Sequence, residues 1–199
     1  MLDVVAAEDA DLRRAIARVG YPAPRQRDPG FPTLLRIILA QQVSTASAAA
    51  IWRKLEGALG GEITPDGLLA LDAAALRAAG FSARKAEYAR GLCAAVASGT
   101  LDVDALAHLE EEAAIAALVQ LRGFGRWSAE IYLLFALGRA DIFPADDLAI
   151  QVAFQRLKRL ETRLAGRELR TLAEPWRPYR GATAVFLWHY YGAATLDES

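Results

Sequence analysis

Apolar residues recur along much of the chain at the three- to four-residue spacing of an α-helix. Nearly every position from 34 to 39 is apolar, as expected of a buried helix, and Pro32 suits its first turn. The same spacing returns over 48–55, where apolar residues share one face, and over 127–137. These stretches predict three helices.

Polar, glycine and proline residues predict where helices begin and end. Residues suited to capping or stopping a helix are Ser44, Asp72, Gly80 and Ser82. Three prolines within 21–30 forbid a continuous helix there, so a short helix should precede this segment and a long helical region should follow it. A shorter helix is expected over about 110–120, and the break at 143–147 leads into another helix.

The composition supports an all-α protein. Forty-two of the 199 residues are alanine, which is the best helix former and a poor strand former. No apolar run is long enough for a membrane helix, and the acidic N-terminus does not resemble a secretory signal. One cysteine, Cys93, and two histidines are too few ligands for an iron–sulfur cluster or a structural zinc. We therefore expect a reduced cytoplasmic protein that does not span a membrane.

The net charge of −1 hides a segregation of charge along the sequence. Acidic residues gather over 102–112, whereas six basic residues lie within 156–170. Because the whole chain is nearly neutral, any contact with nucleic acid has to be argued from local features.

The first local feature is the segment Gly123-Phe124-Gly125, which comes directly before the helix expected over 127–137. Glycines allow a tight turn, and the exposed backbone N–H groups of a helix start, helped by the helix dipole, favour a phosphate. The flanking Arg122 and Arg126 could add positive charge. The same pattern is also typical of an ordinary turn between packed helices, so both interpretations stay open.

Two polar pairs are further candidates. Asp146 and Asp147 lie about twenty residues after the hairpin, at the start of a predicted helix, where one can cap the helix and the other can react. Gln41 and Gln42 lie at the junction between two predicted helices. They are either solvated amides or side chains that fill the space left by an extruded base.

Aromatic residues are the last candidates. They could stack on a nucleobase or line a cationic pocket, although aromatic residues of helices usually lie in the core. The set comprises Trp127, Tyr132, Trp176, Tyr179, Trp188, Tyr190 and Tyr191. Trp127 stands out because it follows the hairpin directly.

Five motifs resemble, in order, those of the helix-hairpin-helix DNA glycosylase superfamily, and more narrowly its 3-methyladenine DNA glycosylase II branch. They are Ile38–Ser44, Phe81–Glu87, Leu121–Glu130, Leu137–Asp147 and Trp176–Arg180 with Leu187–Trp188. The resemblance implies one all-α domain of two helical lobes with a cleft between them and no N-terminal β domain. A helix-hairpin-helix lobe would span about 31–137, and the second lobe would combine about 1–30 with 138–199.

The resemblance also implies residue roles. Asp147 matches the family's catalytic aspartate, and Asp146 would then be the capping residue. Trp127 stands where bifunctional relatives carry the lysine that forms a Schiff base, so a monofunctional enzyme without lyase activity is expected. Trp127, Tyr132 and Trp188 would line the base pocket.

The contacts with DNA are carried over in the same way. Gln41 or Gln42 would be the intercalating side chain, and the hairpin would hold a phosphate, with Arg122 in place of the family's usual proline. The implied DNA-binding set is Gln41, Gln42, Arg122, Gly123, Phe124, Gly125, Arg126 and Ser128. No cofactor is required, but the resemblance includes a structural Na⁺ or K⁺ held by the carbonyls of Val119, Leu121 and Gly123.

The resulting hypothesis is a base excision repair enzyme that hydrolyses the N-glycosidic bond of alkylated purines such as 3-methyladenine and 7-methylguanine. We expect a monomer that acts on damaged duplex DNA at the nucleoid of a bacterial cytoplasm. Hypoxanthine and etheno adducts remain alternatives, as does water activation by Asp147 beyond stabilisation of a cationic sugar. The alternative function is a non-catalytic helix-hairpin-helix DNA-binding module.

Overall fold

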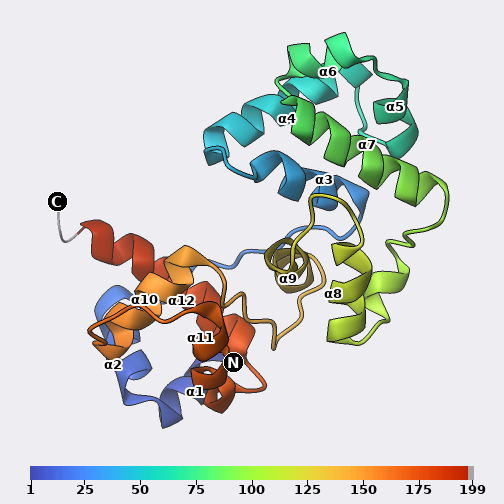
Figure 1. Cartoon of the computed structure of the whole chain (residues 1–199). Coiled ribbons are helices and arrows are strands. Elements are labelled where there is room, and N and C mark those ends of the chain that lie inside the picture. The colour runs from blue at the N-terminus through green and yellow to red at the C-terminus, as the bar shows by residue number, and fades with distance from the viewer. Residues whose placement is uncertain (197–199) are drawn as a thin grey trace. The chain divides into compact units, whose positions relative to one another are not determined.

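The computed structural model describes residues 1–196, with side chains to residue 193, and every regular element within that range is helical. Twelve α-helices and two 3₁₀ helices occur among these residues, which confirms the predicted all-α class (Figure 1). The chain divides into two compact units, Arg27–Leu137 and Met1–Gln26 with Gly138–Ser199. No helix in the described part is long and apolar enough to cross a membrane.

The unit Arg27–Leu137 is built around an almost entirely apolar helix, α3. Its elements are α3 (Phe31–Ala40), α4 (Thr45–Leu59), α5 (Pro65–Ala70), α6 (Ala73–Ala79), α7 (Ala83–Ala97), η1 (Ala105–Ala107), α8 (Glu111–Val119) and α9 (Arg126–Phe135). Leu34, Leu35 and Ile38 of α3 are fully buried, and α3 packs against α4, α7 and α9. The apolar run at 34–39 is therefore the centre of this unit's core.

The predicted helix ends of this unit are confirmed. The side chains of Ser44, Asp72 and Ser82 each accept a backbone N–H from the first turn of α4, α6 and α7. Gly80 ends α6 in the left-handed conformation. These caps satisfy N–H groups that have no partner inside the helix.

The other unit contains two helices before the proline-rich segment, where the sequence predicted one. Its elements are α1 (Leu2–Glu8), α2 (Ala10–Val19), α10 (Leu148–Lys158), α11 (Gly166–Leu172), η2 (Glu174–Trp176) and α12 (Arg180–Leu196). Asp9 divides the first two helices because its carboxylate accepts the N–H groups of Asp11 and Leu12. Lys158 Nζ and Trp176 Nε1 also donate to Asp9, each at 2.8 Å.

A charge network fixes the loop that precedes α10. Arg180, at the start of α12, donates to Asp141 from Nε at 3.0 Å and from Nη2 at 2.9 Å, and both side chains are largely buried. Gly181 N–H donates to the carbonyl of Ala140 at 2.8 Å. The segment leading to Asp147 is therefore held on the first turn of α12.

Candidate functional site

The helix–hairpin–helix predicted around residues 121–125 is formed by α8, a tight turn and α9. Phe124 N–H donates to the Leu121 carbonyl at 2.9 Å, and Gly123 has a φ of +95°. A Cβ atom on Gly123 would lie 2.3 Å from the Tyr88 ring, so only glycine fits there. No side-chain cap is found at Gly125, the N-cap of α9, within the described structure, so the first turn of α9 offers its N–H groups to an external anion.

The two arginines beside the hairpin are paired with carboxylates of the same unit. Arg122 forms an ion pair with Glu87, and Arg126 contacts Glu112 at 2.5 Å and Glu130 at 2.9 Å. The hydrogen bond that Arg126 donates to Glu112 is the main reason why the pKa of Arg126 is raised. The positive charge that the sequence suggested at the hairpin is thus already compensated within the protein.

Two residues of the predicted DNA-binding set have buried side chains. Phe124 is 5% exposed and Ser128 is 4% exposed. Ser128 Oγ lies 3.4 Å from Gln41 Nε2, which donates to it. In this structure both side chains support the hairpin from inside the protein, and a contact of Phe124 with DNA would involve its backbone.

The loop between α3 and α4 separates the roles of its two glutamines. Gln41 Nε2 donates to the Gly123 carbonyl at 2.9 Å, which ties the loop to the hairpin. Gln42 is exposed and has a φ of +56°, a left-handed conformation that is uncommon for a side chain of this size. Gln42 therefore projects from the loop that Gln41 anchors.

Lys85 of α7 was not singled out from the sequence, yet it supports the same loop. Its side chain is largely buried, and Nζ donates to the Leu39 carbonyl at 2.6 Å in the last turn of α3. Burial lowers the pKa of Lys85. Its place in the predicted motif Phe81–Glu87 was a signal, but the acceptor lies 46 residues away and is invisible in the sequence.

A groove of about 440 Å³ runs between this loop, α7 and the hairpin. Its lining residues are Ala40, Gln41, Gln42, Ser82, Arg84, Lys85, Tyr88, Gly123, Gly125, Trp127 and Ser128. The structure thus brings the predicted glutamines, hairpin glycines and Trp127 together around one surface. Trp127 is 37% exposed, so its ring remains accessible.

Asp147 lies in the other unit, at the N-terminus of α10. Its Oδ1 accepts the Ile150 N–H at 3.0 Å and the indole N–H of Trp188 at 3.0 Å. The predicted capping role of Asp146 is wrong, because Asp147 is itself the N-cap. Asp146 instead forms an ion pair with Arg170. It also lies close to Gly166, where a Cβ atom would be 2.0 Å from the Oδ1 of Asp146. The carboxylate of Asp147 is thus oriented by two N–H donors.

Tyr132, predicted for the base pocket, is fully buried. Its hydroxyl accepts the N–H of Gly30 at 2.9 Å, and burial raises its pKa. This contact ties α9 to the segment that leads into α3. The observed environment gives Tyr132 a structural role in the unit Arg27–Leu137.

The monovalent cation site that the resemblance implied at the hairpin carbonyls stays a prediction, because a carbonyl that accepts one hydrogen bond keeps a second lone pair. The Leu121 carbonyl accepts the Phe124 N–H, and the Gly123 carbonyl accepts Gln41 Nε2. Two of the three expected carbonyl ligands, those of Leu121 and Gly123, therefore each accept one N–H group. Within residues 1–196, no group of three or more His, Cys, Asp or Glu residues could hold a metal ion.

The chain is similar to known DNA repair proteins. Residues 35–178 match the family model of the HhH-GPD superfamily base excision DNA repair protein. DNA-3-methyladenine glycosylase 1 of Schizosaccharomyces pombe is 32% identical over 90% of this chain and 82% of its own length. DNA-3-methyladenine glycosylase 2 of Escherichia coli is 30% identical over 89% of this chain and 65% of its own length.

Two solved structures are similar over nearly the whole chain. The DNA-3-methyladenine glycosidase of Bacillus halodurans has a TM-score of 0.85 and 32% identity, covering 97% of this chain and 89% of the other. The S. pombe 3-methyladenine DNA glycosylase in complex with abasic DNA has a TM-score of 0.84 and 29% identity, covering 98% and 96%.

Proposed function

Because the chain belongs to the HhH-GPD superfamily of base excision DNA repair proteins, we propose that it is a monofunctional DNA glycosylase for alkylated purines. The substrate would be duplex DNA carrying bases such as 3-methyladenine or 7-methylguanine, and the enzyme would act as a monomer. The observation that carries this proposal is the carboxylate of Asp147, oriented at a helix start by Trp188 and a backbone N–H.

The unit Arg27–Leu137 supplies the grip on DNA. The N–H groups at the start of α9 hold a phosphate of the damaged strand, since that helix end has no side-chain cap. Gln42 enters the duplex, because it is exposed while Gln41 is bound to Gly123. The amide of Gln42 then fills the space that the flipped nucleotide leaves.

The chemical step is hydrolysis at the sugar carbon C1′. As the N-glycosidic bond breaks, its electron pair leaves with the base, and positive charge develops on the sugar. The Asp147 carboxylate stabilises this charge, water forms the new C1′–O bond, and the proton of that water is released. A base alkylated at a ring nitrogen is already cationic, so it leaves as a neutral base without a general acid.

Two features restrict the chemistry to hydrolysis. Trp127 has no amine for a Schiff base with the sugar, and the nearby Lys85 Nζ is bound to a backbone carbonyl. The indole faces of Trp127 and Trp188 suit a cationic base. Water is the only co-reactant, so the reaction needs no cofactor, and no step uses a cation at the hairpin.

The test is single-turnover release of 3-methyladenine and 7-methylguanine from alkylated duplex DNA. Asp147→Asn should lower the rate by at least about 10²–10³-fold and leave binding to abasic DNA intact, because the charge opposite the cationic sugar is removed. Asp146→Asn is the matched control and should retain most activity. Equal release by wild type and Asp147→Asn would refute the role of Asp147, and strand cleavage coupled to base release would refute the monofunctional assignment.

A further inference from the structure

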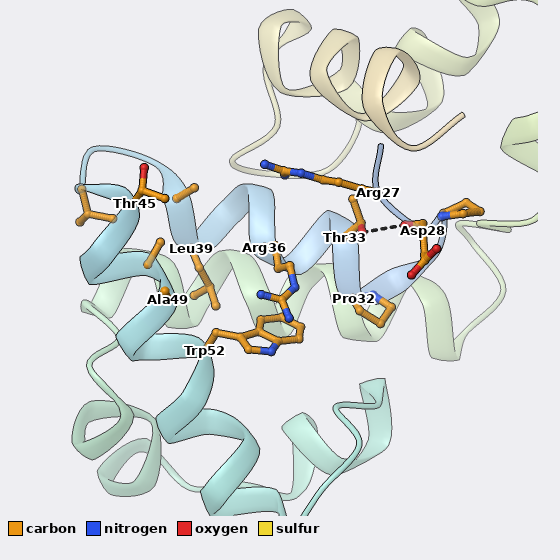
Figure 2. Close-up of a pocket in the computed structure, with 13 residues that line it drawn as sticks. Arg27, Asp28, Pro32, Thr33, Arg36, Leu39, Thr45, Ala49 and Trp52 are labelled. Carbon is orange, nitrogen blue, oxygen red and sulfur yellow. Dashed lines mark hydrogen bonds between the residues drawn. The ribbon is translucent and has the colours of Figure 1, made fainter. Parts of the chain in front are cut away.

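A second groove, of about 580 Å³, lies between α3 and α4 and is not used by the reaction proposed above. Its base is formed by small and apolar side chains, including Ala48 and Ala49 of α4 and Leu39 of α3. Arg27 and Asp28 line it from the segment that leads into α3, and Arg36 lies against the ring of Trp52 (Figure 2). The groove therefore combines an apolar base with two arginines.

The two arginines of this groove, Arg27 and Arg36, differ from those of the hairpin because neither forms a salt bridge with a described residue. Arg122 and Arg126 both do. Asp28 is the single acidic residue of the lining. The lining thus holds two arginines and one carboxylate, and Glu56 acts on Arg36 from beside the groove.

The Arg36 side chain is also held in a defined geometry. Its guanidinium carbon lies 3.4 Å from the centroid of the Trp52 ring, and Trp52 Nε1 donates to Glu56 at 2.6 Å. Burial, together with the nearby charge of Arg27, lowers the pKa of Arg36 even though Glu56 opposes the shift. A guanidinium fixed against an aromatic ring presents its N–H fork with little loss of rotamer freedom when it binds an anion.

The location of the groove indicates which anion it meets. The α3/α4 groove and the hairpin groove share one lining residue, Ala40 at the end of α3. Gln41 and Gln42 line only the hairpin groove, whereas Val43 and Thr45 line only the α3/α4 groove. A side chain that enters a groove of duplex DNA has one sugar–phosphate backbone on each side. With the hairpin on the damaged strand, the α3/α4 groove faces the opposite strand.

The geometry points to a second DNA contact, in which Arg27 and Arg36 bind a phosphate of the strand opposite the damaged base and the apolar base of the groove contacts the adjoining sugar. This inference rests on the proposed glycosylase function, because the roles of Gln42 and the hairpin define which DNA strand each groove faces. It assigns phosphate recognition to residues outside the hairpin and independent of the base pocket.

The first experiment measures the salt dependence of binding to a fluorescent duplex that contains a tetrahydrofuran abasic analogue. Arg36→Met keeps an apolar side chain over Trp52 and removes the charge, and Arg27→Met tests the second cation. Each variant should lower the slope of log affinity against log salt. The double variant Arg27→Met/Arg36→Met should lower it by about 0.9, the value for one phosphate contact, because both arginines share that phosphate. Arg53→Met, an exposed position of α4 outside the groove, is the control and should keep the wild-type slope.

The second experiment identifies the strand by replacing single phosphates with neutral methylphosphonates. In wild type, one replacement opposite the lesion should weaken binding, and the double variant Arg27→Met/Arg36→Met should be insensitive to that same replacement. Replacements in the damaged strand should weaken both proteins equally. Wild-type slopes for both variants, or a loss that maps to the damaged strand, would overturn this contact.

Two controls keep these outcomes interpretable. If Arg36→Met unfolds, Arg27→Met carries the test alone, because its side chain is exposed. Excision of 3-methyladenine by the wild-type protein is measured in parallel. An active wild type with unchanged slopes in the variants contradicts only the second contact, whereas an inactive wild type that does not prefer abasic DNA contradicts the proposed function.

Discussion

The two units hold their candidate site residues by different means. In the unit Arg27–Leu137, apart from the ion pairs of the hairpin arginines, amide and ammonium donors bind backbone carbonyls, as Gln41 does at Gly123 and Lys85 at Leu39. In the other unit, carboxylates are the acceptors, as at Asp147, Asp9 and Asp141. The first arrangement fixes the shape of the backbone that would grip DNA, whereas the second fixes negative charge. The proposed binding of a DNA phosphate depends on the positions of N–H groups, and the proposed reaction depends on the position of a carboxylate.

The largest effect in this comparison is expected from Gly123→Ala. The new Cβ would lie 2.3 Å from Tyr88, at a φ of +95° that alanine disfavours. Overpacking and backbone strain together should lower the free energy of unfolding by about 2–6 kcal/mol. The affinity for abasic DNA should fall at least about tenfold. Gly99→Ala is the control, because Gly99 has a φ of +73° but no neighbour within 4 Å. Equal affinities in a fluorescence titration of the two variants would contradict a shape requirement at the hairpin.

Trp188→Phe should affect the chemical step and spare binding. The change keeps an aromatic ring but removes the N–H that donates to Asp147 at 3.0 Å. A hydrogen bond to a charged group is worth about 1.5–3 kcal/mol, so the excision rate should fall about 10- to 100-fold. The measurement is single-turnover excision beside affinity for abasic DNA. If the variant loses affinity for abasic DNA and keeps its excision rate, Trp188 contributes to DNA binding and not to the chemical step.

Lys85→Met tests whether the loop support is structural or electrostatic. Without the ammonium, the Leu39 carbonyl loses its donor, which should destabilise the protein by about 1–3 kcal/mol. DNA affinity should fall while its salt dependence stays unchanged, because Lys85 contacts a carbonyl and not a phosphate. Urea unfolding and salt titrations check both statements, with the exposed Lys54→Met as the reference. A reduced salt slope would make Lys85 a direct phosphate ligand.

The smallest expected effect is the acid sensitivity of the unit that carries Asp147. Burial opposes ionisation of Asp9, but hydrogen bonds from Lys158, Leu12 and Trp176 prevail and hold its pKa below the ordinary value of 3.8. The carboxylate therefore stabilises the folded state fully above pH 3.8, and this contribution is lost as the pH falls through the lower folded pKa. Asp9→Asn still caps α2 but should flatten this part of the stability–pH curve. If urea unfolding shows the same dependence of stability on acid pH for wild type and Asp9→Asn, the contribution assigned to Asp9 is contradicted.

Local signals in the sequence predicted the elements well but not the contacts between them. Ser44, Asp72 and Ser82 cap helices because a cap needs only the next three residues. The break at Asp9 was missed although its cap on Asp11 and Leu12 is a local signal of the same kind. The sequence could not show its bonds from Lys158 and Trp176, which lie 149 and 167 residues away. Such pairs form only when the chain folds, and no periodicity encodes them.

The candidate site shows the same limit. The positions of Asp147, Trp188 and the hairpin were recognisable, since they stand in ordered motifs. The sequence did not show that Asp147 is its own helix cap or that Gln41 is tied to Gly123. Nor did it single out Lys85 or the stack of Arg36 on Trp52. Each of these depends on which side chains meet across helices, and that is decided by packing.

The hydrogen bond between Gln41 and Gly123 has a consequence for the entropy of binding. A loop that becomes ordered only on DNA loses conformational freedom at that moment, and the affinity is lower by that amount. Here the loop is already attached to the hairpin before any DNA is present. Most of the ordering of this loop takes place during protein folding. Gln42 can therefore probe successive base pairs while the loop that carries it keeps its conformation.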